Sequence, residues 1–124
     1  MSRKIITRRN YNVYNFPTEN TVPEGHYWIR IDNISESITT TGKTAIDVYY
    51  TFQDETGKLH KVKMRYTDGS IAQDEFFDAM VEAGVDEGAD ITDAIGITEE
   101  IDFEYVGNFG AIKNRIPFVE EEVE

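Results

Sequence analysis

Apolar and polar residues alternate along the first half of the chain, and this period of two is the strongest constraint on its fold. The alternation covers residues 26–34, 45–53 and 58–66. Because successive side chains of a strand point to opposite faces of a sheet, each segment is predicted to be a half-buried strand. The second and third segments are joined by Asp54-Glu-Thr-Gly57, which has the glycine of a short hairpin turn. The pattern therefore predicts an antiparallel meander.

The period changes to that of a helix at Ser70. Ser70 and Gln73 have the spacing of a capping box, in which two side chains satisfy open N–H groups at a helix start. The apolar stripe that follows at helical spacing consists of Ile71, Phe76, Phe77, Met80 and Val81. Gly84 predicts the end of the helix.

Alternation returns after an acidic, glycine-containing segment at residues 85–96, which is predicted to be a loop with room for one helical turn. Strands are predicted over residues 97–106 and 109–118, with a turn between them. The chain is thus expected to be mainly β with one helix, in the order β-β-β-α-β-β. This is the order of the OB fold, a five-stranded Greek-key barrel. An open α+β sheet with one helix is the alternative.

Length and composition suit one domain with a single core. We expect a flexible basic and aromatic arm at residues 1–20, an OB-like domain at 21–118 and an acidic tail at 119–124. No apolar run approaches the 18 or so residues that a membrane span requires, and the N-terminus lacks the apolar segment of a signal peptide. Cysteine is absent, which excludes disulfides and thiolate metal sites.

The net charge of −12 is distributed very unevenly along the chain. Residues 1–67 carry 10 basic and 7 acidic side chains, whereas residues 68–104 carry 13 acidic side chains and no basic one. Such a molecule can present a basic surface despite its acidic composition, because a ligand is attracted by the local electric field and not by the net charge. The acidic half can equally be a solvated face that keeps the protein in solution.

The stretch Ser37–Thr44 reads S-I-T-T-T-G-K-T and ends as a nucleotide-binding P-loop does. The first position of that pattern, however, is serine here and not glycine. A P-loop also opens a helix, whereas this stretch precedes the predicted strand at 45–53. We therefore predict that this stretch is a loop between two strands and that it does not take part in nucleotide hydrolysis.

The polar faces of the predicted strands collect basic and aromatic residues. If the apolar faces line the core, these side chains lie together on the outside. Single-stranded nucleic acid requires this mixture, because cations follow phosphates and rings stack on bases. In the OB fold the loop between the first two strands also binds, which adds Lys43. The predicted binding residues are Trp28, Arg30, Lys43, Tyr49, Lys61, Lys63, Arg65, Phe109, Lys113 and Arg115.

Several landmarks in this order resemble a family of small bacteriophage proteins. They are Pro23-Glu-Gly25-His-Tyr27, Thr41-Gly-Lys43, Glu82-Ala-Gly84 and Asp93-Ala-Ile-Gly96. The resemblance covers about residues 22–118. It implies an OB fold and binding of single-stranded DNA, with RNA left open, during replication or recombination in the cytoplasm of a bacterial host. Members often carry more basic residues around the helix than this chain does.

No constellation of residues predicts an enzyme, a metal site or a cofactor. The two histidines, His26 and His60, lie on separate predicted strands, with no carboxylate at metal-ligand spacing. Asp86, Asp90 and Asp93 do not have the spacing of a calcium-binding loop. We therefore expect a protein that is not an enzyme and has no cofactor and no metal.

An alternative function uses the acidic half of the chain. Carboxylates without counter-charges can imitate a phosphate track and occupy the nucleic-acid channel of another protein, as phage inhibitors of host defence such as anti-CRISPR proteins do. A protein partner could then bind the acidic region 68–104 or the tail 120–124. The sequence leaves the oligomeric state open.

Overall fold

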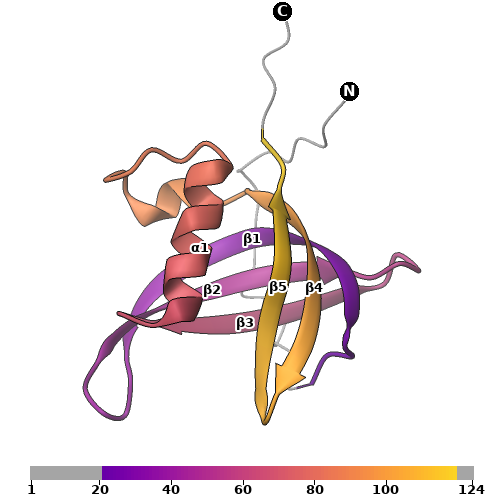
Figure 1. Ribbon diagram of the computed structural model, residues 1–124, viewed down its shortest axis with the longest axis horizontal. Helices are drawn as coiled ribbons and strands as arrows, with labels where there is room; N and C mark the ends of the chain where they lie inside the picture. Colours follow the sequence, from indigo (N-terminus) through magenta and orange to yellow (C-terminus); the bar gives the residue numbers. More distant parts are fainter. Residues whose placement is uncertain (1–20, 120–124) are drawn as a thin grey trace, which may run out of the picture.

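Five antiparallel strands form one sheet in the order β3-β2-β1-β4-β5. The computed structural model describes residues 21–119 (Figure 1), so the predicted arm at 1–20 and residues 120–124 of the predicted tail lie outside the described residues. The strands are β1 (Gly25–Ile38), β2 (Thr44–Gln53), β3 (Leu59–Thr67), β4 (Thr98–Val106) and β5 (Phe109–Pro117). The helix α1 (Ile71–Glu82) and the 3-10 helix η2 (Ile91–Ala94) lie between β3 and β4 in the chain. The predicted order of strands and helix is confirmed.

The central strand β1 pairs with both β2 and β4. It pairs with β2 from Trp28 to Ile38, but with β4 only from Gly25 to Arg30. Between Ile31 and Asn33 the register of the β1–β2 ladder shifts, so Asp32 is the extra residue of a bulge. A bulge bends a strand and breaks its alternation. Beyond the bulge the ladder with β2 carries β1 four residues past its predicted end at Ile34.

The sheet is open in the part of the chain that the structure describes. Its two end strands are β3 and β5, and no ladder joins them. Instead α1 packs against both of these strands, while β4 and β5 cross β1, β2 and β3 in Figure 1. The pairing thus agrees with the open α+β alternative, and closure of a five-stranded barrel is not shown.

The core lies between the concave face of the sheet and α1. The predicted apolar faces of β1 and β2 are buried there, as the alternation indicated. Tyr27, Phe52 and Phe103 pack with ring centroids 5.2–6.4 Å apart. No helix in the described part of the chain is long and apolar enough to cross a membrane.

The ends of α1 are as predicted, but its buried face is not. The Ser70 hydroxyl accepts a hydrogen bond from the Gln73 N–H at 3.1 Å, and Gly84 follows the helix with a positive φ of 107°. Of the predicted apolar stripe, only Phe76 and Met80 are buried. Ile71, Phe77 and Val81 remain 78%, 38% and 44% exposed, while Gln73 and Ala79 take buried positions. The prediction of a five-residue buried stripe is therefore wrong.

Candidate nucleic-acid interface

The convex side of β1, β2 and β3 brings most of the predicted binding residues together. Tyr49 on β2 lies opposite Lys63 on β3, and two residues further along β2, on the same face, Thr51 lies between Lys61 and Arg30. Trp28 pairs with Gln53 at the far end of the same ladder. We call this set the outer basic face, and it consists of Trp28, Arg30, Tyr49, Lys61, Lys63 and Arg65.

Two cations of the outer basic face share one buried carboxylate. Asp32, at the bulge of β1, accepts a hydrogen bond from Arg30 Nε at 2.6 Å and lies 3.4 Å from Lys61 Nζ. Lys61 Nζ also donates to Thr51 Oγ1 at 2.7 Å. The Asp32 side chain is 1% exposed, whereas those of Arg30 and Lys61 are 30% and 22% exposed. Asp32 therefore holds both cations beside one another at the surface.

Arg65 has its own carboxylate partner. Its Nε and Nη2 donate to the two oxygens of Asp47 at 2.8 and 3.2 Å, which is a bidentate pair. The hydrogen bond from Arg65 is the main reason that the pKa of Asp47 lies below its ordinary value. The Arg65 side chain stays 41% exposed.

Lys63 and Lys43 form no ion pair with the described residues. Lys63 is exposed in the middle of the outer basic face, between Lys61 and Arg65 on the same side of β3. Lys43 is exposed at the end of the β1–β2 loop, where its N–H donates to Thr39 Oγ1 at 3.1 Å. Strand β2 begins directly after it, at Thr44, so the predicted strand after Gly-Lys-Thr is confirmed.

Trp28 lies at the margin of the outer basic face, beside acidic residues of β4. It pairs with Glu100, and its ring packs edge-on against His26 with centroids 5.4 Å apart. His26 Nε2 lies 2.6 Å from Glu100 and its Nδ1 lies 2.8 Å from Asp102. The hydrogen bond to Asp102 does most to raise the pKa of His26 above its ordinary value.

Phe109 and Lys113 on β5 do not join the outer basic face. Lys113 pairs with Asp102, so β4 with its acidic residues separates it from β1. Phe109 opens β5 at the β4–β5 hairpin and is 80% exposed. Both side chains are accessible, but they lie apart from the outer basic face and do not extend it.

Arg115 was predicted on the outside of β5 and instead lies inside the domain. The register between β4 and β5 shifts between Glu100 and Asp102, and Asn114 has a φ of 54°. This bulge reverses the alternation, so that Arg115 points inward and the next residue, Ile116, is 56% exposed. The inclusion of Arg115 in the surface site is therefore wrong.

Arg115 belongs to a buried polar cluster that spans four strands. Its Nη1 donates to both Glu99 oxygens at 3.0 and 2.8 Å, and its Nη2 donates to the Tyr66 hydroxyl at 2.8 Å. The Tyr66 hydroxyl in turn lies 2.9 Å from that of Tyr50. Burial opposes the charge of Arg115, but the oxygens of Tyr66, Tyr50 and Glu99 outweigh it and raise its pKa. Burial also raises the pKa of Glu99, against the effect of Arg115.

The Arg115 cluster also connects the two open ends of the sheet. Tyr66 lies on β3 and Arg115 on β5, so the hydrogen bond between them bridges strands that share no ladder. Phe76 of α1 stacks on Tyr66 with ring centroids 4.8 Å apart, and the Arg115 guanidinium carbon lies 5.7 Å from the Phe76 centroid. A cation, two rings and a carboxylate thus fill the place where a strand pair would close a barrel.

Sequence reasoning overlooked the carboxylates that hold the cations. The alternation places Asp32 and Asp47 on the polar faces of their strands. It does not indicate that they form ion pairs with Arg30, Lys61 and Arg65. Glu99 and Tyr66 gave no signal, because only the β5 bulge brings Arg115 to them.

Residues 21–119 contain no cluster of three or more side chains that could bind a metal ion. Asp90, from the acidic loop, instead caps η2 by accepting from the Thr92 N–H at 3.0 Å. His60 is buried, and its Nε2 lies 3.3 Å from Asp54.

Comparison with protein-family models, with curated proteins and with solved structures found no match for this chain. The outer basic face therefore has to be interpreted from its own chemistry.

Proposed function

We propose that this protein binds single-stranded nucleic acid, without catalysis, through the outer basic face. The observation that carries the proposal is the register of β1, β2 and β3, which sets Lys61, Lys63 and Arg65 beside Tyr49 on one continuous surface. The face carries four cations, Arg30 among them, above two carboxylates. Its local charge is therefore positive on a molecule whose net charge is −12.

The geometry of β3 suits an extended phosphate backbone. Alternate residues of a strand are about 6–7 Å apart at ~3.3 Å per residue, close to the distance between successive phosphates of a single strand. Lys63 forms no ion pair with the described residues and can contact phosphate directly, while Asp32 and Asp47 hold the neighbouring cations in place. Stacking on Tyr49 or Trp28 would add about 1–3 kcal/mol per base.

The topology supports an OB-like interpretation of this sheet. In the OB fold a five-stranded, partly open barrel binds through strands 2 and 3 and the loop between strands 1 and 2. Here β1 pairs with β2 and β4, the helix follows β3, and Lys43 ends the β1–β2 loop. We further propose that the protein acts on DNA in a phage replication or recombination module, in the cytoplasm of the bacterial host.

The test is a fluorescence anisotropy titration with single- and double-stranded oligonucleotides at two salt concentrations. The double variant Lys61→Gln/Lys63→Gln should weaken binding to all sequences and lower the salt slope by about 0.7 per lost phosphate contact. Trp28→Ala should weaken binding with little change of slope, because stacking releases few ions.

Control variants distinguish a loss of specific contacts in the outer basic face from a general loss of positive charge or of an exposed ring. Lys58→Gln/Lys113→Gln removes two exposed cations outside the outer basic face, and Phe109→Ala removes an exposed ring. Both should bind as the wild type does, and thermal melts confirm that each variant is folded. A folded wild type that does not bind single strands at low salt would refute the proposal.

The acidic side is the second candidate, and one observation favours it. Asp74, Glu75, Asp78 and Glu82 are exposed on α1, and none of them forms an ion pair with the described residues. If single strands are not bound, this surface becomes the functional one, with the nucleic-acid channel of another protein as its target. Binding to a basic partner, lost when these acids are neutralised, would support that function.

A further inference from the structure

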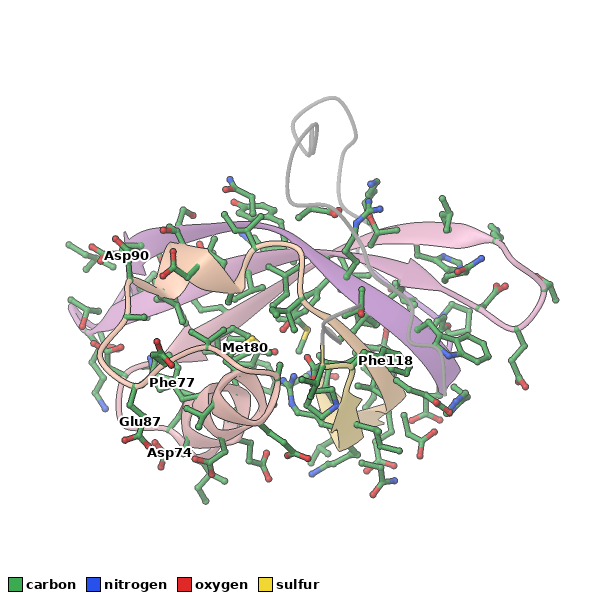
Figure 2. The ribbon with its side chains drawn as sticks, turned by 90° about the horizontal axis from the view of Figure 1, so that it is seen from above. Asp74, Phe77, Met80, Glu87, Asp90 and Phe118 are labelled. Carbon is green, nitrogen blue, oxygen red and sulfur yellow. The ribbon has the colours of Figure 1, made fainter. Side chains whose placement is uncertain are left out.

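A second surface, on the opposite side of the domain, has the features of a peptide-binding groove. It lies between α1 and the segment that follows it and has a volume of about 370 Å³. Its apolar side chains are Phe77, Met80 and Val81 of α1 with Val85 and Ile91 beyond the helix. Figure 2 shows Phe77 and Met80 on the side of α1 that faces this segment.

Two apolar side chains of the groove are only partly covered by the described chain. Phe77 and Val81 are 38% and 44% exposed, although both lie at positions where an amphipathic helix is expected to be buried. Adjacent exposed apolar side chains with a polar rim mark interaction sites. An occupant of the groove should therefore offer apolar side chains.

The charged residues of the rim are all acidic. Asp78, Asp86 and Glu87 line it beside Gly88 and Ala89, and Asp74 and Asp90 are exposed on the helix and on the segment that form the groove. None of these five carboxylates forms an ion pair with the described residues, and residues 68–104 contain no lysine or arginine. The occupant should therefore also offer cations on both sides of its apolar part.

We propose that the groove binds the basic segment at the chain's own N-terminus, residues 3–9. Its sequence is R-K-I-I-T-R-R, in which two adjacent isoleucines lie between two pairs of cations. Ile5 and Ile6 would enter the apolar part, and Arg3, Lys4, Arg8 and Arg9 would pair with the rim. The proposal is independent of nucleic-acid binding by the outer basic face.

The length of the chain before Thr21 allows this contact within one molecule. Residues 10–20 can span at most about 36–40 Å, at ~3.3–3.6 Å per residue. This is comparable with the diameter of about 35 Å that a domain of ~100 residues has.

Disulfide trapping tests the contact directly, because the chain contains no cysteine. The double variant Ile6→Cys/Ala89→Cys places one thiol in the segment and one on the groove, and a bridge requires Cα atoms within about 7 Å. The control is Ile6→Cys/Thr56→Cys, in the β2–β3 turn. That turn lies at the end of the sheet where β1 begins, since Gln53 pairs with Trp28. The turn is therefore close to Thr21, and proximity along the chain alone would favour the control pair.

We expect the Ala89 pair to oxidise within the monomer on the order of tenfold faster than the Thr56 pair, because binding raises the local concentration of the segment. Adding Asp86→Lys/Glu87→Lys should remove that advantage. Equal rates for the two pairs would overturn the proposal. Bridged dimers as the main product would overturn it in favour of a second copy as the source of the segment.

Discussion

At the scale of single residues, Arg115 and Glu99 make the interaction with the largest expected effect on stability. Their side chains are 9% and 0% exposed. Removing one partner leaves an uncompensated buried charge, which costs about 3–5 kcal/mol, whereas replacing both by apolar residues is often neutral. We predict that Arg115→Met lowers the free energy of unfolding by about that amount, and that Arg115→Met/Glu99→Leu recovers most of it.

Urea denaturation measures both variants, and Lys113→Met serves as the control on the same strand. The control should change stability by less than about 0.5 kcal/mol, because Lys113 is exposed and lacks an ion pair among the described residues. A loss below about 1 kcal/mol for the single Arg115 variant would mean that water reaches Glu99 in the folded state.

A second prediction at this scale concerns pH. Asp102 and Glu100 raise the pKa of His26 above its ordinary value of 6.5, so the folded state holds this proton more tightly than the unfolded state does. The resulting stabilisation is complete below about pH 6.5 and is lost as the pH rises through the higher folded pKa. The difference in urea midpoint between the wild type and His26→Gln should therefore shrink with increasing pH.

Trp28 offers an independent readout of this titration, because its ring packs against that of His26. The fluorescence of Trp28, the only tryptophan, should change with a midpoint above pH 6.5 in the wild type and stay flat in His26→Gln. A midpoint below 6.5 would show that the carboxylates do not hold the proton.

At the scale of elements, the bulge of β5 depends on one residue with a left-handed backbone. Asn114 has a φ of 54°, which asparagine and glycine tolerate far better than β-branched residues do. Asn114→Val should cost roughly 1–2 kcal/mol more than Asn114→Gly. Both variants lose the hydrogen bond from Asn114 Nδ2 to Asp102 at 2.8 Å, so the difference between them isolates the backbone.

Thermal or urea melts of the two variants give this difference. Equal stabilities would contradict the prediction, because they would show that the left-handed backbone at Asn114 does not limit the stability of the domain.

At the scale of the whole molecule, the uneven charge should make stability depend on salt. Thirteen carboxylates in residues 68–104 repel one another, and Arg115 and His26 are their only ion-pair partners among the described residues. Salt screens this repulsion, with a screening length of about 10 Å at ~0.1 M. We predict that the urea midpoint rises with sodium chloride, and rises less in Asp74→Asn/Asp78→Asn/Glu82→Gln.

A midpoint that falls with salt would contradict this prediction. It would show that the ion pairs of Arg30, Lys61 and Arg65 contribute more to stability than the repulsion removes. The carboxylates of these pairs are buried, so salt screens the pairs less than it screens the exposed carboxylates, and we expect the repulsion to dominate the salt dependence.

Local patterns in the sequence were enough to predict the elements and most of their faces. Alternation predicted that Val48 and Tyr50 are buried while Tyr49 points outward, and the capping pattern predicted the helix start at Ser70. These properties follow from local backbone geometry, in which a period of two or of 3.6 is repeated over neighbouring residues. The cations of β3 could be placed on one face for the same reason.

The places where that local geometry is interrupted, and the surfaces that meet, depend on the packing of distant segments. The bulges at Asp32 and Asn114 reverse the faces that follow them, and they exist because of the strands paired alongside. The face of α1 that is buried depends on where β3 and β5 end, so Phe76 is covered and Phe77 is not. Pairing between distant segments is set by the packing of the whole domain, and no pattern within a single segment contains it.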